Sequence, residues 1–215
     1  MPLTRIELLA LAVIEGELQV LLGKRAEAPH QGRWALPGGV LRIDLDADLS
    51  AACGRVAMER LGLELPGASQ LCAVGARQRD PRAPWALSVV YWSTLQAGQL
   101  PAAPGKRLEA LKWSPASAAI GEMALAFDHG SLVARGVATL RQEVEALRFP
   151  MGLMPEQFTL AELQAASEAV LARALDKSSF RRRVDAAGCV SVVDGLRREG
   201  PFRPAQVFAL RESAQ

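Results

Sequence analysis

Five stretches of the chain are rich in apolar and β-branched residues and are short enough to be strands. They cover residues 5–14, 18–24, 71–76, 85–95 and 111–113. The first two flank the polar triplet Glu-Gly-Glu at 15–17, which predicts a β-hairpin. Residues 26–33 are predicted to form a polar loop, and Pro-Gly-Gly at 37–39 a tight turn.

Two further stretches have the three- and four-residue spacing of amphipathic helices. The first covers about 48–61 and is followed by Gly62, in the position of a C-cap glycine. The second covers 131–149, and its apolar seam consists of Val133, Val137, Leu140, Val144 and Leu147. This helix either packs on the sheet of its own domain or serves as a dimer contact or connecting rod. Gly136 should weaken it near its start.

A junction rich in proline and glycine divides the chain. Residues 149–155 read Phe-Pro-Met-Gly-Leu-Met-Pro. Proline stops helices and biases the residue before it toward extended geometry. We therefore predict one domain over 1–150 and another over 151–215. The first should be an α/β/α sandwich with a mixed sheet, so the whole chain falls in the α+β class.

The C-terminal segment has the element order of a winged helix-turn-helix domain. Thr159 and Glu162 form a capping box at the start of a helix that should end near Leu175. Residues 176–179 offer a turn and a new N-cap, and a second helix is predicted over 180–187. Strands at 189–196 and 205–211 then flank a basic tip, the wing.

Basic residues concentrate in this predicted domain. Ser179, Arg182, Arg183 and Ala186 share one face of the second helix, which is small, polar and cationic. A triple arginine alone is usually a solvated face, but in this element order it predicts contact with double-stranded DNA. The predicted DNA-binding residues are Lys177, Ser178, Ser179, Arg181, Arg182, Arg183, Arg197, Arg198 and Arg203.

Composition narrows the class of protein. Half of the 215 residues are hydrophobic and 22% are charged, so a packed core forms. A net charge of +2 argues against a uniformly basic surface but allows a local basic patch. The three cysteines lack CxxC spacing, as is usual in a reducing cytoplasm. Glu15 and Glu17 interrupt the apolar run at 8–22, and no secretory signal opens the chain, so we expect a cytoplasmic protein without membrane spans.

Residues 34–63 resemble a Nudix box. The family motif runs glycine, five residues, glutamate, seven residues, then Arg-Glu-aliphatic-any-Glu-Glu-any-Gly-aliphatic. Its second half is matched by Arg55, Ala57, Glu59, Gly62 and Leu63. Val56 and Arg60 stand where the family has glutamates, and the earlier glutamate falls on Ala47. The opening glycine also lies two residues early, which indicates an insertion.

These departures remove a metal site. Positions 56, 59 and 60 share one helix face, from which a working box directs carboxylates at Mg²⁺. Here that face carries an isopropyl group, one carboxylate and a guanidinium. Without the metal nothing activates water, so we expect no catalysis, no metal and no cofactor, with Arg55 and Glu59 as a remnant. The alternative is a Mg²⁺-dependent Nudix hydrolase of ADP-ribose or another nucleoside diphosphate, with Asp46, Asp48 or Glu64 assisting the metal.

Four segments resemble the Nudix-related transcriptional regulators of the NrtR family. They lie at 78–91, 126–129, 158–164 and 175–182. The resemblance implies a Nudix-like domain that senses ADP-ribose and a winged helix that binds operators of NAD-metabolism genes, giving a repressor. It further implies a homodimer on a two-fold operator. Ser178 and Ser179 replace the family's usual Arg-Asn, which affects the operator sequence.

A nucleoside diphosphate calls for guanidinium forks and an aromatic or apolar slot for the base. The predicted ligand-binding residues are Arg25, Trp34, Gly38, Gly39, Arg60, Arg77, Arg79, Arg82 and Phe127. Arg60 would supply the positive charge that Mg²⁺ supplies in an active box. Several residues in these segments have a structural alternative: Trp34 packs in the core, Arg55 pairs with a carboxylate such as Glu59, and Asp80 with Pro81 shapes a turn. His129 is either half of an acid–base pair with Asp128 or a buried or capping histidine.

A third class of function is a plain oligomeric interaction protein, in which the seam at 133–147 forms the contact. The ligand, the operator and the direction of regulation stay open at this point.

Overall fold

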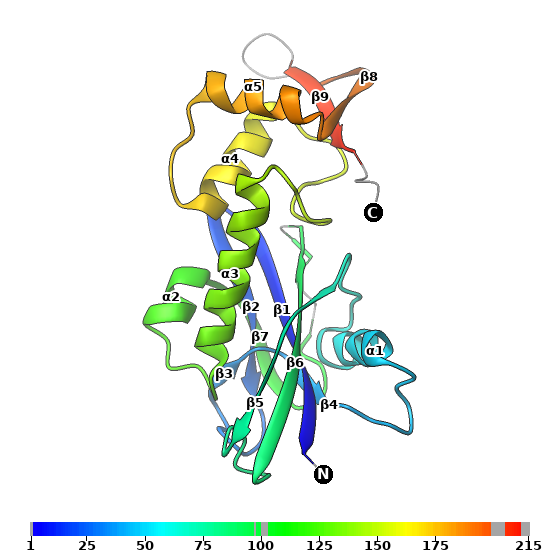
Figure 1. The fold of residues 1–215 in the computed structure, drawn as a ribbon, viewed down its shortest axis with the longest axis vertical. Coiled ribbons are helices and arrows are strands. Elements are labelled where there is room, and N and C mark those ends of the chain that lie inside the picture. The colour runs from blue at the N-terminus through cyan, green and yellow to red at the C-terminus, as the bar shows by residue number, and fades with distance from the viewer. Residues whose placement is uncertain (1, 97, 100–102, 199–204, 212–215) are drawn as a thin grey trace.

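A computed structural model of the chain describes residues 2–96, 98–99, 103–198 and 205–211. In chain order the elements are β1 (Leu3–Ile14), β2 (Glu17–Arg25), β3 (Trp34–Ala35), β4 (Gly38–Val40), α1 (Leu49–Leu61), β5 (Ser69–Arg77), β6 (Trp85–Thr94), β7 (Leu108–Pro115), α2 (Ala116–Gly121), α3 (His129–Glu145), α4 (Leu160–Leu171), α5 (Lys177–Ala187), β8 (Val190–Arg198) and β9 (Ala205–Leu210). The first ten form a sheet domain, and α4 to β9 form a second body at one end of the molecule (Figure 1).

The large sheet is mixed, as the sequence predicts. Its central path is β3-β2-β1-β6-β5, with β4 paired to β1 and β7 paired to β2. The β1–β6 pair is parallel, with Ile6 opposite Val89, and the remaining pairs are antiparallel. The predicted hairpin joins β1 to β2, and Glu15 and Gly16 turn with positive φ.

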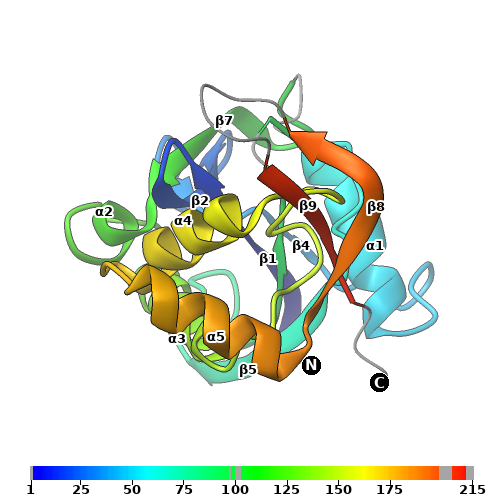
Figure 2. The same cartoon turned by 90° about the horizontal axis from the view of Figure 1, so that it is seen from above.

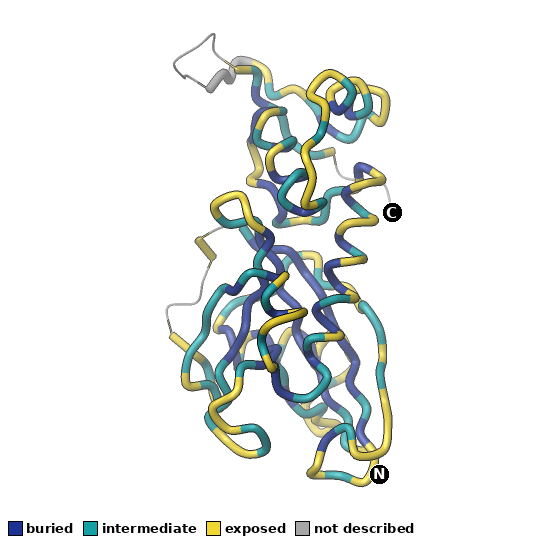
Figure 3. Tube along the Cα trace, turned by 90° about the vertical axis from the view of Figure 1, so that its left-hand side faces the viewer, coloured by how far each residue is buried: buried dark blue, intermediate teal, exposed yellow. Residues whose placement is uncertain are grey.

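Strand β1 is the centre of the core because both of its faces are covered. Ile6 and Leu8 pack toward α1, whereas Leu9 and Leu11 pack toward α3, as period-two alternation requires. Helices α2 and α3 cover one face and α1 the other, so the α/β/α sandwich is confirmed (Figure 1). A continuous buried band runs along these central strands (Figure 3).

The seam of α3 packs mainly on the sheet of its own domain, and its last residue, Leu147, connects the helix to the C-terminal core. The dimer contact stays a prediction. All five of its apolar residues are buried, and the first four pack in the core cluster that contains Leu9. Gly136 is a packing requirement as well as a weak helix former, because a Cβ there would overlap the side chain of Leu9. The seam therefore holds α3 on the sheet.

Several predicted boundaries were wrong. Gly38 and Gly39 begin strand β4, because pairing with β1 straightens a segment that its composition marks as a turn. Helix α3 ends at Glu145, helix α4 ends at Leu171 with Ala172 left-handed, and α5 begins at Lys177. Strand β7 is longer than predicted, β8 extends to Arg198, and α2, β3 and β4 were missed.

The C-terminal body has its own small core around Phe158, which is fully buried with Leu163, Phe180 and Val184. The capping box of Thr159 and Glu162 is present at the start of α4. Asp176 caps α5 by accepting a hydrogen bond from the Ser179 amide, and Gly188 ends that helix in the left-handed region. Seen from the end of the molecule, α5 and the β8–β9 hairpin form its outer surface (Figure 2).

The two bodies share side chains at their junction. Leu147 packs in the C-terminal core, whereas Leu153 and Val170 pack in the core of the sheet domain. Thr94 at the end of β6 donates a hydrogen bond to the Met151 carbonyl. The division at residue 150 stays a prediction. Among the described residues no helix is long and apolar enough to cross a bilayer.

Candidate functional site

A cationic cleft opens beside the start of β1 and β4. Of the described residues that line it, five are arginines and one, Glu27, is acidic. The lining consists of Arg5, Arg25, Glu27, Ala28, Ala35, Leu36, Gly38, Val40, Arg60, Arg82, Arg107 and Leu108. Such a concentration of guanidinium groups suits an anion that accepts paired hydrogen bonds. Arg25, Gly38, Arg60 and Arg82 were predicted from the sequence to bind ligand.

Arg60 is fixed at one wall of this cleft. Its Nε donates to the Gly38 carbonyl at 2.8 Å, and its Nη1 donates to the Lys106 carbonyl at 2.6 Å. Burial lowers the pKa of the guanidinium, and the nearby charges of Arg107 and Arg5 lower it further. The group nevertheless remains a cation at neutral pH, because an arginine pKa lies far above that range. Arg60 thus contributes a fixed positive charge from the helix face where the family places a glutamate.

Arg25 also lines the cleft, next to aromatic rings. Its Nε donates to the Pro29 carbonyl, and its guanidinium carbon lies 5.1 Å from the centre of the Phe127 ring. Phe127 also packs edge-on against His30 at 4.6 Å. Burial lowers the pKa of Arg25, and the charges of Arg5 and Arg82 add to that effect. Mutual repulsion among these guanidiniums would be relieved by a bound anion.

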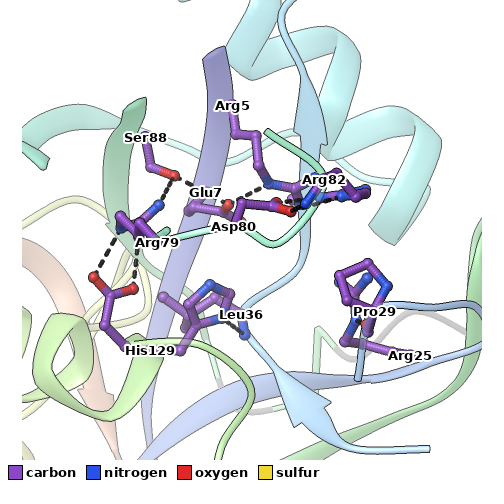
Figure 4. Close-up of polar contacts among 12 residues, drawn as sticks. Arg5, Glu7, Arg25, Pro29, Leu36, Arg79, Asp80, Arg82, Ser88 and His129 are labelled. Carbon is purple, nitrogen blue, oxygen red and sulfur yellow. Dashed lines mark hydrogen bonds and ion pairs between the residues drawn. The ribbon is translucent and has the colours of Figure 1, made fainter. Parts of the chain in front are cut away.

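Behind the cleft lies a buried network of ion pairs that the sequence analysis missed (Figure 4). Arg5 donates to Glu7 Oε1 at 2.8 Å, and Ser88 Oγ donates to the same oxygen at 3.3 Å. The side chains of Arg5 and Glu7 are 7% and 1% exposed. Burial alone would lower the pKa of Arg5, but Glu7 raises it above its ordinary value. An arginine and a glutamate two residues apart in an otherwise apolar strand were the available signal.

Arg79 belongs to this network and is not among the described residues that line the cleft, so its predicted contact with a ligand stays a prediction. Its Nε and Nη2 donate to the two carboxylate oxygens of Asp128 at 2.8 and 2.7 Å. Its Nη1 donates to Ser88 Oγ at 2.5 Å. All three of its guanidinium nitrogens thus bind protein oxygens, and the side chain is 7% exposed.

Arg82 lines the cleft but is held by Asp80. The Asp80 carboxylate accepts hydrogen bonds from the Arg82 amide, Nε and Nη2. Burial alone would raise the pKa of Asp80, but its bonds to Arg82 bring that pKa down to about 2. Asp80 therefore shapes the turn, as the alternative interpretation held, and also orients a cleft arginine.

His129 is a buried structural histidine, which agrees with the second of its two predicted roles, a buried or capping histidine. It is 1% exposed, and its Nδ1 accepts a hydrogen bond from the Leu36 amide at 2.9 Å. Burial lowers its pKa to about 4, so the ring is neutral at pH 7 and Nε2 carries the proton. Through Leu36, the start of α3 is tied to a residue of the cleft lining.

Two predicted ligand residues lie elsewhere. Trp34 is half-buried against the core, with Lys112 Nζ 4.4 Å from its ring centre. Arg77 is exposed at the end of β5, paired across the sheet with Trp85. Gly39 contacts the cleft only indirectly, because it faces Val56 and Arg60 on α1. The place of each residue in the folded sheet decides whether it reaches the cleft, and spacing in the sequence does not reveal that place.

The remnant of the Nudix box is internally paired. Arg55 binds Asp46 through Nε at 2.6 Å and Nη2 at 2.8 Å, and reaches Glu59 at 3.3 Å. The alternative interpretation of Arg55, pairing with a carboxylate, therefore holds, although Asp46 is its main partner. Val56 is fully buried in the core. Among the described residues no three acidic, histidine or cysteine side chains converge as a metal site would require.

The predicted DNA-binding helix α5 lies at the far end of the molecule from this cleft (Figure 1). Lys177, Ser178, Arg181 and Arg182 are exposed, whereas Ser179 is half-buried in the first turn. Ser178 and Ser179 are thus helical, because the cap is supplied by Asp176. An exposed helix with several free cationic side chains can contact phosphates while its face enters a groove.

Arg183 is positioned differently from its neighbours. Its Nη2 donates to the Glu145 carbonyl at 2.6 Å, and its Nη1 lies 3.6 Å from the Glu145 carboxylate. Arg173 reaches the same carboxylate at 2.5 Å. On the wing, Arg197 and Arg198 lie in β8 opposite Gln206 and Ala205. Arg203 lies outside the described residues.

Comparison with known proteins agrees with both parts of the predicted fold, the Nudix-like domain and the winged helix. Residues 4–135 match the model of the family described as NUDIX domain, and residues 150–210 match the NrtR DNA-binding winged helix domain. The chain is 34% identical over 215 residues to the ADPR responsive transcriptional repressor NtrR of Acinetobacter baylyi, covering 98% of this chain and 84% of that protein.

Solved structures show the same arrangement. The crystal structure of Shewanella oneidensis NrtR complexed with a 27mer DNA is 29% identical, with a TM-score of 0.81 over 97% of this chain and 93% of that one. The NUDIX domain of the same protein complexed with ADP ribose is 30% identical, with a TM-score of 0.58 over 65% of this chain and 89% of that one. The resemblance recognised in the sequence is confirmed, and the chain belongs to the NrtR family, in which a Nudix domain precedes a winged helix.

Proposed function

We propose that this chain is a transcriptional repressor of NAD-metabolism genes that binds a two-fold DNA operator as a homodimer. In this proposal α5 enters the major groove, and Lys177, Arg181 and Arg182 contact phosphates or bases. Their exposure on one helix at the end of the molecule supports the assignment. The S. oneidensis relative has been crystallised with DNA and shares the fold over almost the whole chain.

The small-molecule signal is ADP-ribose or a related nucleoside diphosphate, bound in the arginine-lined cleft. The observation that carries this assignment is the convergence of Arg5, Arg25, Arg60 and Arg82 on one cavity. A diphosphate provides the paired acceptor oxygens that such guanidinium forks recognise. Phe127, beside Arg25, offers an aromatic surface for a base or sugar.

The Nudix domain acts here as a sensor and not as a hydrolase. A Mg²⁺ ion needs converging oxygen ligands, but Val56 is buried in the core and Arg60 places a cation at the other family glutamate position. Arg55 already occupies Asp46 and Glu59. These residues do not fit the metal that the fold family uses. Ligand binding should therefore persist in the presence of EDTA.

The proposal is tested by titrating ADP-ribose into a complex of the protein with a labelled promoter fragment from an NAD-metabolism operon. We expect DNA to be released as the ligand is added, with AMP as a control ligand that lacks the diphosphate. DNA binding that is unchanged at millimolar ADP-ribose would refute the sensor. Formation of AMP from ADP-ribose with Mg²⁺ or Mn²⁺ at ordinary enzymatic rates would refute the loss of catalysis.

A further inference from the structure

A continuous series of polar contacts leads from the cleft to the first residue before α3. It begins at Arg5, which lines the cleft and donates to Glu7 Oε1. Ser88 donates to that same oxygen and accepts from Arg79, which holds Asp128 with two hydrogen bonds (Figure 4). Asp128 is the residue directly before α3, so the start of that helix is tied to the cleft.

Burial makes this network sensitive to a bound anion. Glu7 is 1% exposed, and its second oxygen, Oε2, has no hydrogen-bond partner among the described residues. A diphosphate that recruits Arg5 therefore withdraws the main cation from a carboxylate that water does not reach. A buried carboxylate left in that state is strongly unfavourable, so it must draw in another cation. Arg79 is the candidate for this second cation, because only the hydroxyl group of Ser88 separates it from Glu7.

The other end of α3 is attached to the recognition helix. Glu145, its last residue, holds Arg183 of α5 through its carbonyl and carboxylate, and holds Arg173 from the segment before α5. One turn earlier, Arg141 donates to the Val170 carbonyl at the end of α4. Helix α3 thus connects the buried network beside the cleft to α5, and it runs from the sheet domain toward the C-terminal body (Figure 1).

We propose that the Arg79–Asp128 ion pair is the contact through which the cleft controls the winged helix. The proposal rests on the proposed function. When a diphosphate binds Arg5, Arg79 turns from Asp128 to Glu7, and the start of α3 is released from the sheet. Movement of α3 carries Glu145 with it and displaces α5 through Arg183. The ligand prefers the released state because only there is Glu7 satisfied, which is the differential affinity that coupling requires.

Two variants should hold the protein in one or the other of the two states of this exchange, with Arg79 released from Asp128 or bound to it. Asp128→Asn removes the charge that retains Arg79, so the free protein should bind DNA as weakly as the ligand-saturated wild type does. Glu7→Gln removes the buried negative charge that requires a second cation, so Arg79 stays with Asp128. This variant should bind DNA like the free wild type, and ADP-ribose should not change its DNA affinity. In both, the ratio of DNA dissociation constants with and without ADP-ribose should fall from about tenfold or more to about one. A merely structural role would not separate the two variants in this way.

The matched control is Glu143→Gln, which makes the same chemical change on the same helix. Glu143 pairs with Arg148 near the end of α3 and is not in contact with the network. This variant should keep both the DNA affinity and the ligand response of the wild type. Thermal unfolding of each protein shows that the comparison is made between folded chains.

Direct titration calorimetry with ADP-ribose and a separate DNA titration are run on every protein. Asp128→Asn should bind ADP-ribose more tightly than wild type, because it already occupies the released state that the ligand prefers and Asp128 itself does not line the cleft. If Asp128→Asn or Glu7→Gln responds to the ligand as wild type does, the ion-pair exchange is wrong while the sensor stands. If the wild type itself fails to bind ADP-ribose or DNA, the proposed function fails instead.

Discussion

Two regions of this protein are rich in arginine, and they use that residue in opposite ways. In and behind the cleft, Arg5 and Arg79 are each 7% exposed and paired with carboxylates at hydrogen-bond distance. On α5, Arg181 and Arg182 are exposed at the end of the molecule. In the free protein the fold holds the first set in one geometry, whereas the second set remains free to follow the surface of a partner.

The difference reflects what each region is proposed to bind. A small diphosphate is recognised by forks whose directions are fixed in advance, because little conformational entropy is then lost on binding. A DNA backbone presents many phosphates with mobile counterions, so the number of charges matters more than the direction of each. Glu7, Asp80 and Asp128 therefore contribute to recognition by orienting arginines. Neither these three carboxylates nor Arg79 contacts the proposed ligand directly.

The largest expected difference between the regions concerns stability. Arg5→Met leaves Glu7 buried without its cation, which should lower the free energy of unfolding by about 3 kcal/mol. Arg181→Met, on the exposed helix, should lower it by less than about 0.5 kcal/mol. Urea denaturation measures both, and equal losses would contradict the contrast between buried and exposed arginines.

The next effect is a pH dependence confined to the sheet domain. The folded pKa of His129 is about 4, below its ordinary 6.5, so the unfolded chain takes up the proton first. The contribution of neutral His129 to the free energy of unfolding is fully present above pH 6.5 and is lost as the pH falls toward 4. That loss is about 3 kcal/mol.

His129→Asn retains an acceptor for the Leu36 amide and has nothing to protonate. It should therefore lose less stability between pH 7 and pH 4 than wild type, as urea denaturation at each pH will show. His30→Asn is the control, since His30 is half-buried and its pKa is lowered mainly by modest burial. A wild-type curve superimposable on that of His129→Asn would count against the buried neutral ring.

A smaller effect is expected on ligand affinity. Arg60→Met keeps an unbranched apolar stem but removes the fixed charge at the cleft wall, and should weaken ADP-ribose binding by about 30-fold. Arg107→Ala should cost only a few-fold, since the Arg107 side chain is 60% exposed. Calorimetry with EDTA present gives both values. A requirement for Mg²⁺ in the wild type would overturn the role of Arg60.

The smallest effect concerns one phosphate contact on α5. Arg182→Ala should weaken DNA binding by about fivefold to tenfold at low salt and reduce the salt slope by about one unit. ADP-ribose affinity should not change. Arg42→Ala, which removes a half-exposed arginine from the sheet domain, provides the control and should leave the slope intact. An unaltered slope for Arg182→Ala would argue against placing α5 in the groove.

Local patterns in the chain were sufficient for the longer elements and their order, although α2, β3 and β4 were missed. The hairpin of β1 and β2, helix α1 between Asp48 and Gly62, and the capping box before α4 all depend on residues within a few positions of one another. Such features are readable because propensity, capping and periodicity act locally. Val56 and Arg60 can likewise be read directly from the chain, and the resemblance to the Nudix motif is what predicts carboxylates at those two positions.

The partners of the arginines could not be read in this way. Arg79 and Asp128 are 49 residues apart, and Arg183 and Glu145 are 38 apart. The sequence marks each of them as a charge, and Arg79 and Arg183 as candidates for phosphate contact. Only the packing of β5, β6 and α3 around β1, and of α5 against the end of α3, determines which guanidiniums are already occupied. The chain by itself thus specified the two domains and their chemistry, while tertiary structure decided which charges face a ligand, because ion pairing depends on distance in space and not along the sequence.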